Sequence, residues 1–327
     1  MKQYHQPTLL QRRMKGVALV TVLFILTIMT VTVTWLSEEV LLSLRRSENI
    51  RDSEQAWQTL IGSESWARGV LLRDSRESGT DHPGEKWNQL GQGVTVEQGK
   101  LLTVIEDLQG RFNLNNLLID AAVGPRREAN KELPLHWSAA FRRLLIALEL
   151  NPALSDAVLD WLDPDQNVRG TAGAEDIDYL GMEPPYRAAD RGFAEVSELL
   201  RVKGFEPAMV AKLAPYVSAL PATDVRININ TAPALLLRIL GKDLLSAAES
   251  EQLVNDRPVA DGYSVEEFLQ HDMMAGEQDT AILLIGNSSS YFLIRSSTEV
   301  GRARKNIHSL VERTNETTAV IKRSPVL

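Results

Sequence analysis

The chain has 327 residues, with 35 basic and 43 acidic side chains, a formal net charge of -8 and no cysteine. This length allows two domains, the acidic balance disfavours nucleic acid as a partner, and the lack of cysteine excludes disulfides and thiolate metal sites. The mean hydropathy of -0.15 shows that most of the chain is not a membrane bundle.

The N-terminal region places a short basic segment before a long uncharged run. Three basic residues between 12 and 15 precede Gly16, and the next twenty residues, from Val17 to Leu36, carry no charge. A helix of this length spans about 30 Å, the thickness of the hydrocarbon core of a bilayer. The segment therefore predicts a single-pass anchor in the inner membrane, with a cytoplasmic N-terminus and a periplasmic C-terminal body.

The position of the small residue distinguishes two kinds of N-terminal segment. A secretory signal has its small-residue cleavage site after the apolar run, whereas Gly16 stands before it. This order resembles a type IV prepilin leader, which is cut between Gly16 and Val17 so that the mature chain keeps the helix. A plain uncut membrane anchor is the alternative.

The apolar helix is predicted to continue beyond the membrane. Apolar residues keep helical spacing after Leu36, so the pattern predicts one helix over 17–73 whose second half packs on a core. Residues 78–84 are typical of a turn. Strands are predicted at 94–97 and 101–107, and 111–115 could form a third.

Helical patterns then dominate until about residue 284, and strand patterns return at 291–300, 305–313 and 318–322. The predicted fold class is α+β, with a long N-terminal transmembrane helix packed on an antiparallel sheet that a large all-helical insertion interrupts. Two sequential domains with a small C-terminal sheet are the alternative. The predicted parts are a leader at 1–16, a transmembrane segment at 17–36, a discontinuous sheet domain at 74–118 and 285–327, and the insertion at 119–284.

An acidic cluster within the insertion carries the strongest chemical signal. Seven acids and a single base, Arg169, lie between Asp156 and Asp178, and Pro164 with nearby glycines bends the backbone there. Oxygen ligands without His or Cys suit Ca²⁺, and one ion takes only six to eight oxygens, so two ions are expected. A solvated acidic loop with helix caps is the alternative. The candidate ligands are Asp160, Asp163, Asp165, Asn167, Glu175, Asp176 and Asp178.

Two other signals are weaker. Residues 199–207 and 227–233 resemble helix-hairpin-helix turns, but the helices after the second turn have no basic surplus, so DNA binding is not expected. The five histidines stand in no catalytic pattern, and no Gly-rich phosphate loop occurs. The sequence therefore predicts a protein that is not an enzyme.

Taken together, the chain resembles the K-type minor pseudopilins of bacterial type II secretion systems, the GspK family. The resemblance implies a pseudopilin fold with a calcium-binding helical insertion, placed at the tip of a short periplasmic pseudopilus that helps to export folded proteins. It also implies I- and J-type minor pseudopilins, other pseudopilins and the inner-membrane secretion platform as partners, with cleavage by the prepilin peptidase and N-methylation. The segments that carry it are 15–19, 160–165, 173–176, 184–186 and 229–233.

The fifth residue after the expected cleavage site supports the K-type assignment. Most pilins and pseudopilins carry Glu there, whereas this chain has Thr21, as K-type members typically lack the Glu. A membrane-anchored periplasmic calcium-dependent hydrolase or binding protein is the alternative function.

Overall fold

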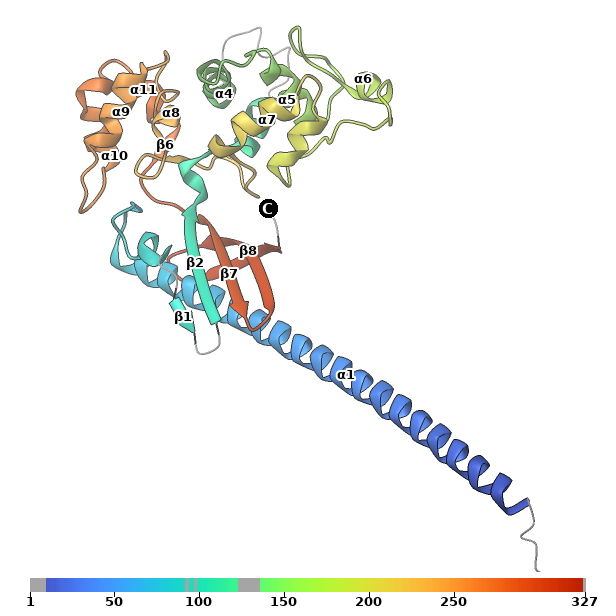
Figure 1. Cartoon of the computed structure of the whole chain (residues 1–327). Helices are drawn as coiled ribbons and strands as arrows, with labels where there is room; N and C mark the ends of the chain where they lie inside the picture. The colour runs from blue at the N-terminus through green and yellow to red at the C-terminus, as the bar shows by residue number, and fades with distance from the viewer. Residues whose placement is uncertain (1–9, 92–93, 97–98, 123–135, 326–327) are drawn as a thin grey trace, which may run out of the picture.

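The computed structural model describes residues 10–91, 94–96, 99–122 and 136–325 (Figure 1). The first nine residues of the predicted leader and residues 123–135 of the predicted insertion lie outside the described part. Side chains are described from Val17 onward along the first helix.

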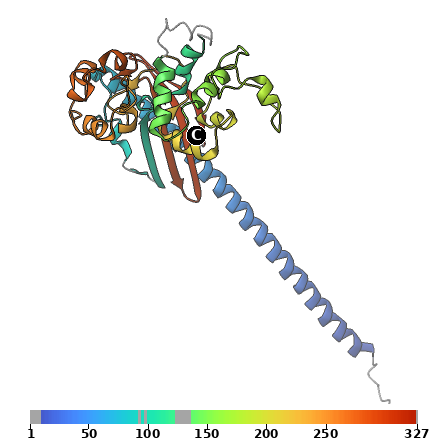
Figure 2. The same cartoon turned by 90° about the horizontal axis from the view of Figure 1, so that it is seen from above.

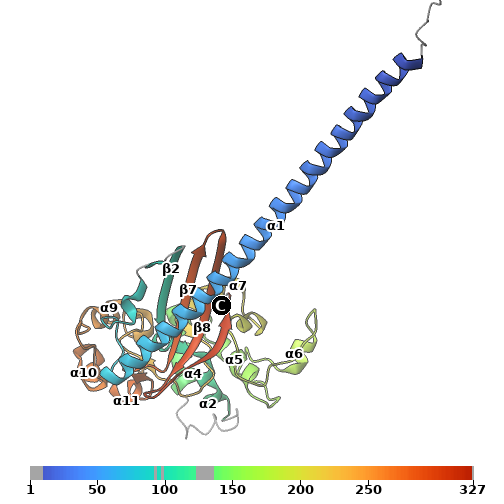
Figure 3. The same ribbon diagram turned by 90° about the horizontal axis from the view of Figure 1, so that it is seen from below.

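One helix, α1 (Leu10–Glu77), forms the N-terminal part and is longer at both ends than the predicted 17–73. At 1.5 Å per residue it is about 100 Å long. Its first half projects from the body in all three views (Figures 1, 2 and 3). Every residue from 17 to 51 is exposed, and the apolar run is long enough to cross a membrane. Gly16 and Val17, the predicted processing residues, lie within this helix.

The second half of α1 packs on a five-stranded antiparallel sheet with the order β1-β2-β7-β8-β9. Alternating apolar and polar residues give each long strand one face for the helix, and the C-terminal strands agree with the predicted ranges. β2 pairs with β7 from Gly99↔Val300 to Asp107↔Phe292. The strands are β1 (Val94–Val96), β2 (Gly99–Asp107), β7 (Tyr291–Val300), β8 (Ala303–Arg313) and β9 (Thr318–Ser324).

A small apolar core holds α1 against the sheet. Leu71 from the helix and Phe292 from β7 are fully buried, and the ring of Trp87 meets that of Phe292 edge-on at 5.5 Å between centroids. The remaining buried members are Ala67, Ile105, Ile294 and Val311. The membrane-distal part of α1 is thus fixed to its own sheet.

The insertion joins β2 to β7 and lies beyond the end of the sheet (Figures 1 and 3). Its short helices enclose a separate and much larger core, in which Trp137 and Phe141 are fully buried. Its α-helices are α2 (Leu117–Ala121), α4 (His136–Ala147), α5 (Leu154–Leu162), α6 (Asp176–Leu180), α7 (Pro207–Leu213), α8 (Ala234–Leu237), α9 (Ala247–Asn255), α10 (Val265–Gln270) and α11 (Gln278–Ala281). Its 3₁₀ helices are η2 (Leu108–Gly110), η3 (Leu114–Asn116), η4 (Val196–Arg201), η5 (Ala214–Tyr216) and η6 (Asp272–Met274), whereas η1 (Asn88–Gly91) lies between α1 and β1.

The insertion is not entirely helical. Its short strands form two parallel pairs, β3 (Phe112–Asn113) with β4 (Val217–Ser218) and β5 (Ile227–Asn228) with β6 (Ile285–Gly286). The possible third strand at 111–115 therefore pairs within the insertion and does not extend the main sheet. Sequence alternation predicts a strand but does not identify its partner.

A buried carboxylate links the sheet to the insertion. Asp107, the last residue of β2, accepts hydrogen bonds from Asn228 Nδ2 at 2.9 Å, Thr231 Oγ1 at 2.6 Å and Ser289 Oγ at 2.7 Å. Burial raises the pKa of Asp107, and the hydrogen bonds from Thr231 and Ser289 oppose that shift. The Asn-Thr segment between β5 and α8 is thus held to the end of the sheet.

Candidate metal centre

Helix α5 positions the first two acids of the predicted calcium cluster. All nine of its residues are buried, and Asp160 is in its last turn. Asp163 caps the C-terminus with extended backbone, as expected for a residue that precedes a proline. Asp160 and Asp163 are only 0% and 2% exposed.

The loop after α5 brings two further acids to the same place. One carboxylate oxygen from each of Asp163, Asp165 and Glu175 lies within 4.8 Å of the others. Asp163 Oδ1 accepts the backbone N–H of Asp165 at 3.2 Å, which folds the loop tightly. This spacing fits carboxylates that share one cation.

Arg169 neutralises only part of this charge. Its Nε and Nη2 donate to Asp163 Oδ2 at 3.1 and 2.9 Å, and its Nη2 also donates to the carbonyl of Ala121 at 2.6 Å. Its Nε lies 3.4 Å from Asp160 Oδ1. One guanidinium thus contacts two of the four acids, and Asp165 and Glu175 add further negative charge, so a negative excess remains.

Three buried carboxylate oxygens of this cluster are suited to contact a cation. Within the described part of the chain, Asp160 Oδ1 and both Oε atoms of Glu175 have no hydrogen-bond partner. Burial, followed by the charges of Asp160 and Asp163, raises the pKa of Glu175 to about 8. Burial likewise raises the pKa of Asp160 to about 7. A bound divalent cation would satisfy these oxygens and favour their ionised forms.

The other predicted ligands have different partners. Asp178 is paired with Lys203 Nζ at 2.8 Å, which lowers its pKa, and its Oδ2 accepts the N–H of Glu175. Asp176 Oδ1 accepts the N–H of Ala188 at 3.1 Å. Asn167 is exposed and donates to Asp165 Oδ1 at 2.7 Å. The structure thus brings Asp160, Asp163, Asp165 and Glu175 together and places these three around them.

Sequence analysis did not single out Asp190 as a member of this acidic region. Its charge raises the pKa of Glu175, and its own pKa is raised by burial and by Asp176. Its φ of +49° is unusual for a residue other than glycine, although Asp tolerates it better than most. The sequence did not indicate Asp190, because it lies outside the dense run of acids between Asp156 and Asp178.

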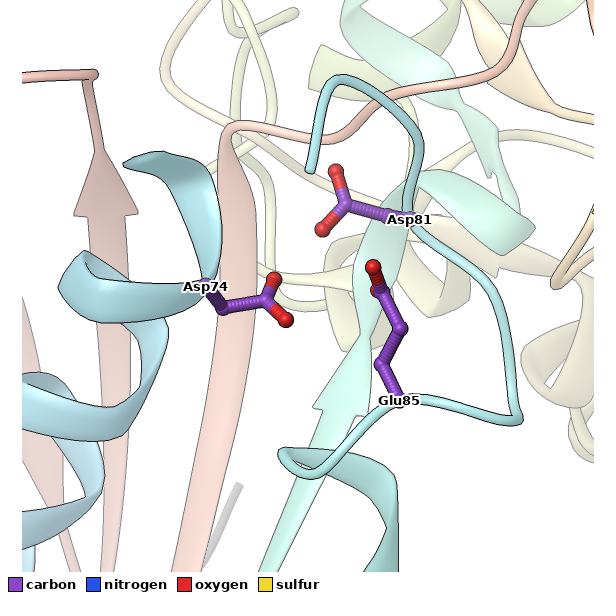
Figure 4. A group of neighbouring side chains, drawn as sticks. All are labelled: Asp74, Asp81 and Glu85. Atoms are coloured by element: carbon purple, nitrogen blue, oxygen red, sulfur yellow. The ribbon is translucent and has the colours of Figure 1, made fainter. Parts of the chain in front are cut away.

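A second acidic group, also missed, lies at the membrane-distal end of α1. Figure 4 shows the carboxylates of Asp74, Asp81 and Glu85 facing one another, and their oxygens also lie within 4.8 Å. Arg313 pairs with two of these three carboxylates, because its Nη1 lies 3.0 Å from Asp74 Oδ2 and its Nη2 lies 2.6 Å from Asp81 Oδ1. Trp87 Nε1 donates to Glu85 at 2.7 Å. This group is therefore a structural ion cluster.

Known proteins that are similar to this chain indicate its family. Two family models, both described as type II secretion system protein K, match residues 110–222 and 227–284. The chain is 36% identical to type II secretion system protein K of Pseudomonas aeruginosa over 93% of this chain and 90% of that one. It is 32% identical to the Aeromonas hydrophila protein of the same name, over 95% and 97%.

The chain belongs to the type II secretion system protein K family. It also has the fold of one chain in the solved GspK-GspI-GspJ complex of enterotoxigenic Escherichia coli, with a TM-score of 0.72, 24% identity, and coverage of 85% of this chain and 98% of that one. The prediction of a minor pseudopilin of the type II secretion system is confirmed, and a self-standing calcium-dependent hydrolase or binding protein is not favoured. The predicted α+β fold class is confirmed, and the apolar half of α1 fits a single-pass anchor.

Proposed function

We propose that this chain is the tip subunit of the pseudopilus, where its insertion blocks further growth and its calcium site stiffens that insertion. The observation that carries the proposal is the place of the insertion, beyond the sheet and away from the exposed half of α1 (Figures 1 and 3). A broad body at that end obstructs the addition of another subunit there. No catalytic role is part of this proposal.

Thr21 supports a position with no subunit ahead. Its Oγ1 donates to the carbonyls of Val17 and Ala18 at 2.9 and 3.0 Å, so its own helix satisfies the hydroxyl. A Glu at this position would need a cationic partner, such as the terminal amine of a neighbouring subunit, because an unpaired charge in the membrane is costly. Thr21 carries no charge and therefore needs no cationic partner from a neighbouring subunit.

The proposed topology and partners follow from the family. The basic segment before Val17 would stay in the cytoplasm and place the insertion in the periplasm. The prepilin peptidase would cut between Gly16 and Val17, after which the new terminus would be methylated. The exposed apolar half of α1 would then pack against I- and J-type minor pseudopilins and other pseudopilins above the inner-membrane platform.

The test of the tip position uses the membrane-extracted protein. Its mature N-terminus should be Val17 by mass spectrometry, and Gly16→Leu should leave the precursor uncut. Electron microscopy of overproduced pseudopili should find a tag on this chain at one filament end only. A tag distributed along the filament would contradict the proposal.

Calcium binding in the insertion is the second part of the proposal. Asp160, Asp163, Asp165 and Glu175 would hold one ion, since they supply the crowded and unpartnered oxygens. Asp176, Asp178 and Asn167 lie close along the chain, and a second ion there would require Asp178 to leave Lys203. Calcium would stabilise the folded insertion by about 2.7 kcal/mol at a hundredfold excess over Kd.

Thermal unfolding with calcium and with a chelator tests this site. Calcium should raise the melting temperature by roughly 5–10 °C, given about 2–4 °C per kcal/mol for a body of this size. Glu175→Gln and Asp163→Asn should reduce that increase. Glu251→Gln, an exposed acid on α9, should leave it unchanged. Superimposable curves for the unmodified protein would show that the cluster binds no calcium.

A further inference from the structure

A pocket of about 360 Å³ lies between the sheet and the insertion. Leu293 of β7 and Leu310 of β8 line it from the sheet. Their neighbours Phe292 and Val311 pack toward α1, and successive strand residues point to opposite faces, so the pocket is on the sheet face that α1 leaves free. The opposite wall comes from η4, α7 and β4 of the insertion.

The interior of the pocket is mainly apolar. Val210 and Val217 from the insertion and Leu108 from η2 are buried in its walls. Leu200 of η4 also lines it and is 50% exposed, although it is a large aliphatic residue. Covering such a solvent-exposed apolar surface with an apolar side chain lowers the free energy, because both surfaces are removed from water.

One polar atom in the pocket lacks a partner. Ser218 of β4 lines the pocket and is 4% exposed. Its Oγ is buried and has no hydrogen-bond partner among the described residues. A buried hydroxyl without a partner is costly, so an occupant that offers a backbone N–H or carbonyl would remove that cost.

The rim of the pocket carries an excess of positive charge. Arg111 and Arg295 both line it, and both pair with the single carboxylate of Glu106, Arg295 at 2.8 Å. Lys322 of β9 is paired with Glu195 of the insertion. Three cations thus face two acids, and the partly exposed Arg111 and Arg295 have capacity for a further carboxylate.

We propose that this pocket receives a segment of another protein that inserts an apolar side chain and presents an adjacent carboxylate to Arg111 and Arg295. The apolar walls would hold the side chain, the rim would hold the acid, and Ser218 would bond the peptide backbone. Strand addition to the neighbouring edge is disfavoured, because β9 has a register shift beside Leu310 and carries Lys322 there. An inserted side chain therefore explains the surface better than an added strand.

Short capped peptides test the proposal on the full-length protein in lipid nanodiscs. The probes are N-acetyl-Phe-Asp-amide and the matched Phe-Asn and Phe-Lys compounds, with binding followed by saturation-transfer NMR against empty nanodiscs. The Asp probe should bind about two- to fivefold more tightly than the Asn probe, the range expected for an exposed ion pair. The Lys probe should bind most weakly.

Matched variants locate the binding. Arg295→Gln should remove the preference for the Asp probe while Arg111 keeps Glu106 paired. Ala194→Trp, which places an indole at an exposed position of the pocket wall, should weaken all probes, whereas Ala260→Trp on an exposed loop should not. Unchanged melting temperatures would show that each variant is folded.

Three results would overturn the proposal. Equal binding of the three probes would show that the charged rim does not recognise the carboxylate. A signal no stronger than that of empty nanodiscs would show that the pocket does not bind these peptides. Binding of octanoate without any binding of the peptides would identify a fatty carboxylate as the occupant. Because the probes act on this chain alone, these results do not depend on calcium or on the position of the chain in the pseudopilus.

Discussion

Two buried arginines differ in how far they neutralise the acids around them. Arg313 is 5% exposed, pairs with Asp74 and Asp81, and lies 4.5 Å above the centroid of the Phe292 ring. Arg169 is 2% exposed and pairs with Asp160 and Asp163, and the carboxylates of Asp165 and Glu175 lie close to that of Asp163. Each acid of the first cluster accepts a hydrogen bond from Arg313 or Trp87, whereas the second cluster has buried carboxylate oxygens without a donor among the described residues.

Replacing Arg313 should therefore destabilise the protein severely. Arg313→Met leaves two buried carboxylates without their cation, and losing one partner of a buried pair costs about 3–5 kcal/mol. Denaturant unfolding of the full chain measures the loss. The exposed Arg302→Met should change stability by less than about 0.5 kcal/mol. A similar small change for Arg313→Met would show that the pair contributes little.

Asp74 should make stability fall as the pH rises. Burial, with the charges of Glu85 and Asp81, raises the pKa of Asp74 from 3.8 to about 7 despite Arg313. The folded state then binds the proton more tightly than the unfolded state, so stability is lost between about pH 4 and pH 7. Asp74→Asn keeps an acceptor for Arg313 and should flatten this part of the pH profile.

The matched control for that measurement is Asp279→Asn, an exposed acid on α11. Its free energy of unfolding, followed from about pH 5 to pH 8, should decline as in the unmodified protein. If Asp74→Asn declines equally, the proton is not held at Asp74.

Local sequence predicted the acids near α5 but not their pairing. Pro164 and the dense run of carboxylates identified the loop, because both act within a few residues. The burial of Arg169 and the partnership of Asp81 with Arg313, 232 residues later in the chain, depend on tertiary packing. Such contacts have no local signal in a single sequence.

At the scale of elements, α1 combines a membrane half and a packing half. Leu26→Asp places a charge near the middle of the apolar run, where it costs about 2.5–3.5 kcal/mol. We expect less protein in the membrane fraction and loss of copurification with the I- and J-type pseudopilins. Glu54→Gln, exposed on the same helix, should preserve both. Intact copurification of Leu26→Asp would show that assembly does not use this half.

Long periodic elements were predictable, and short ones were less so. The strands β8 and β9 alternate regularly, β7 does so after its first four buried residues, and α1 contains no proline, so the local pattern was enough to predict them. The helical pattern predicted up to about residue 284 is divided into short elements, such as the 3₁₀ helix η4 over Val196–Arg201 and the helix α7 over Pro207–Leu213. Packing in the insertion, rather than helix propensity, sets these boundaries.

At the scale of the whole molecule, we expect the core beneath α1 and the core of the insertion to open separately, although a third, small cluster joins the insertion to β7. The core beneath α1 and the core of the insertion share no buried member. Calcium should therefore slow amide hydrogen exchange over 154–190 while exchange in β7 and β8 stays unchanged. Equal protection of both regions would show that the two cores open as one unit.

The pairing of Asp107 with Phe292 has an evolutionary consequence. The end of β2 pairs with the start of β7, as in a β-hairpin. The whole insertion therefore occupies the position of the hairpin turn. The entropy of closing a loop grows only with the logarithm of its length, so an ancestral turn could grow into a domain at modest cost. We expect the pairing of β2 with β7 to keep its register if a short turn replaces the insertion. The same should hold if the insertion is grafted onto the hairpin of a simpler pseudopilin.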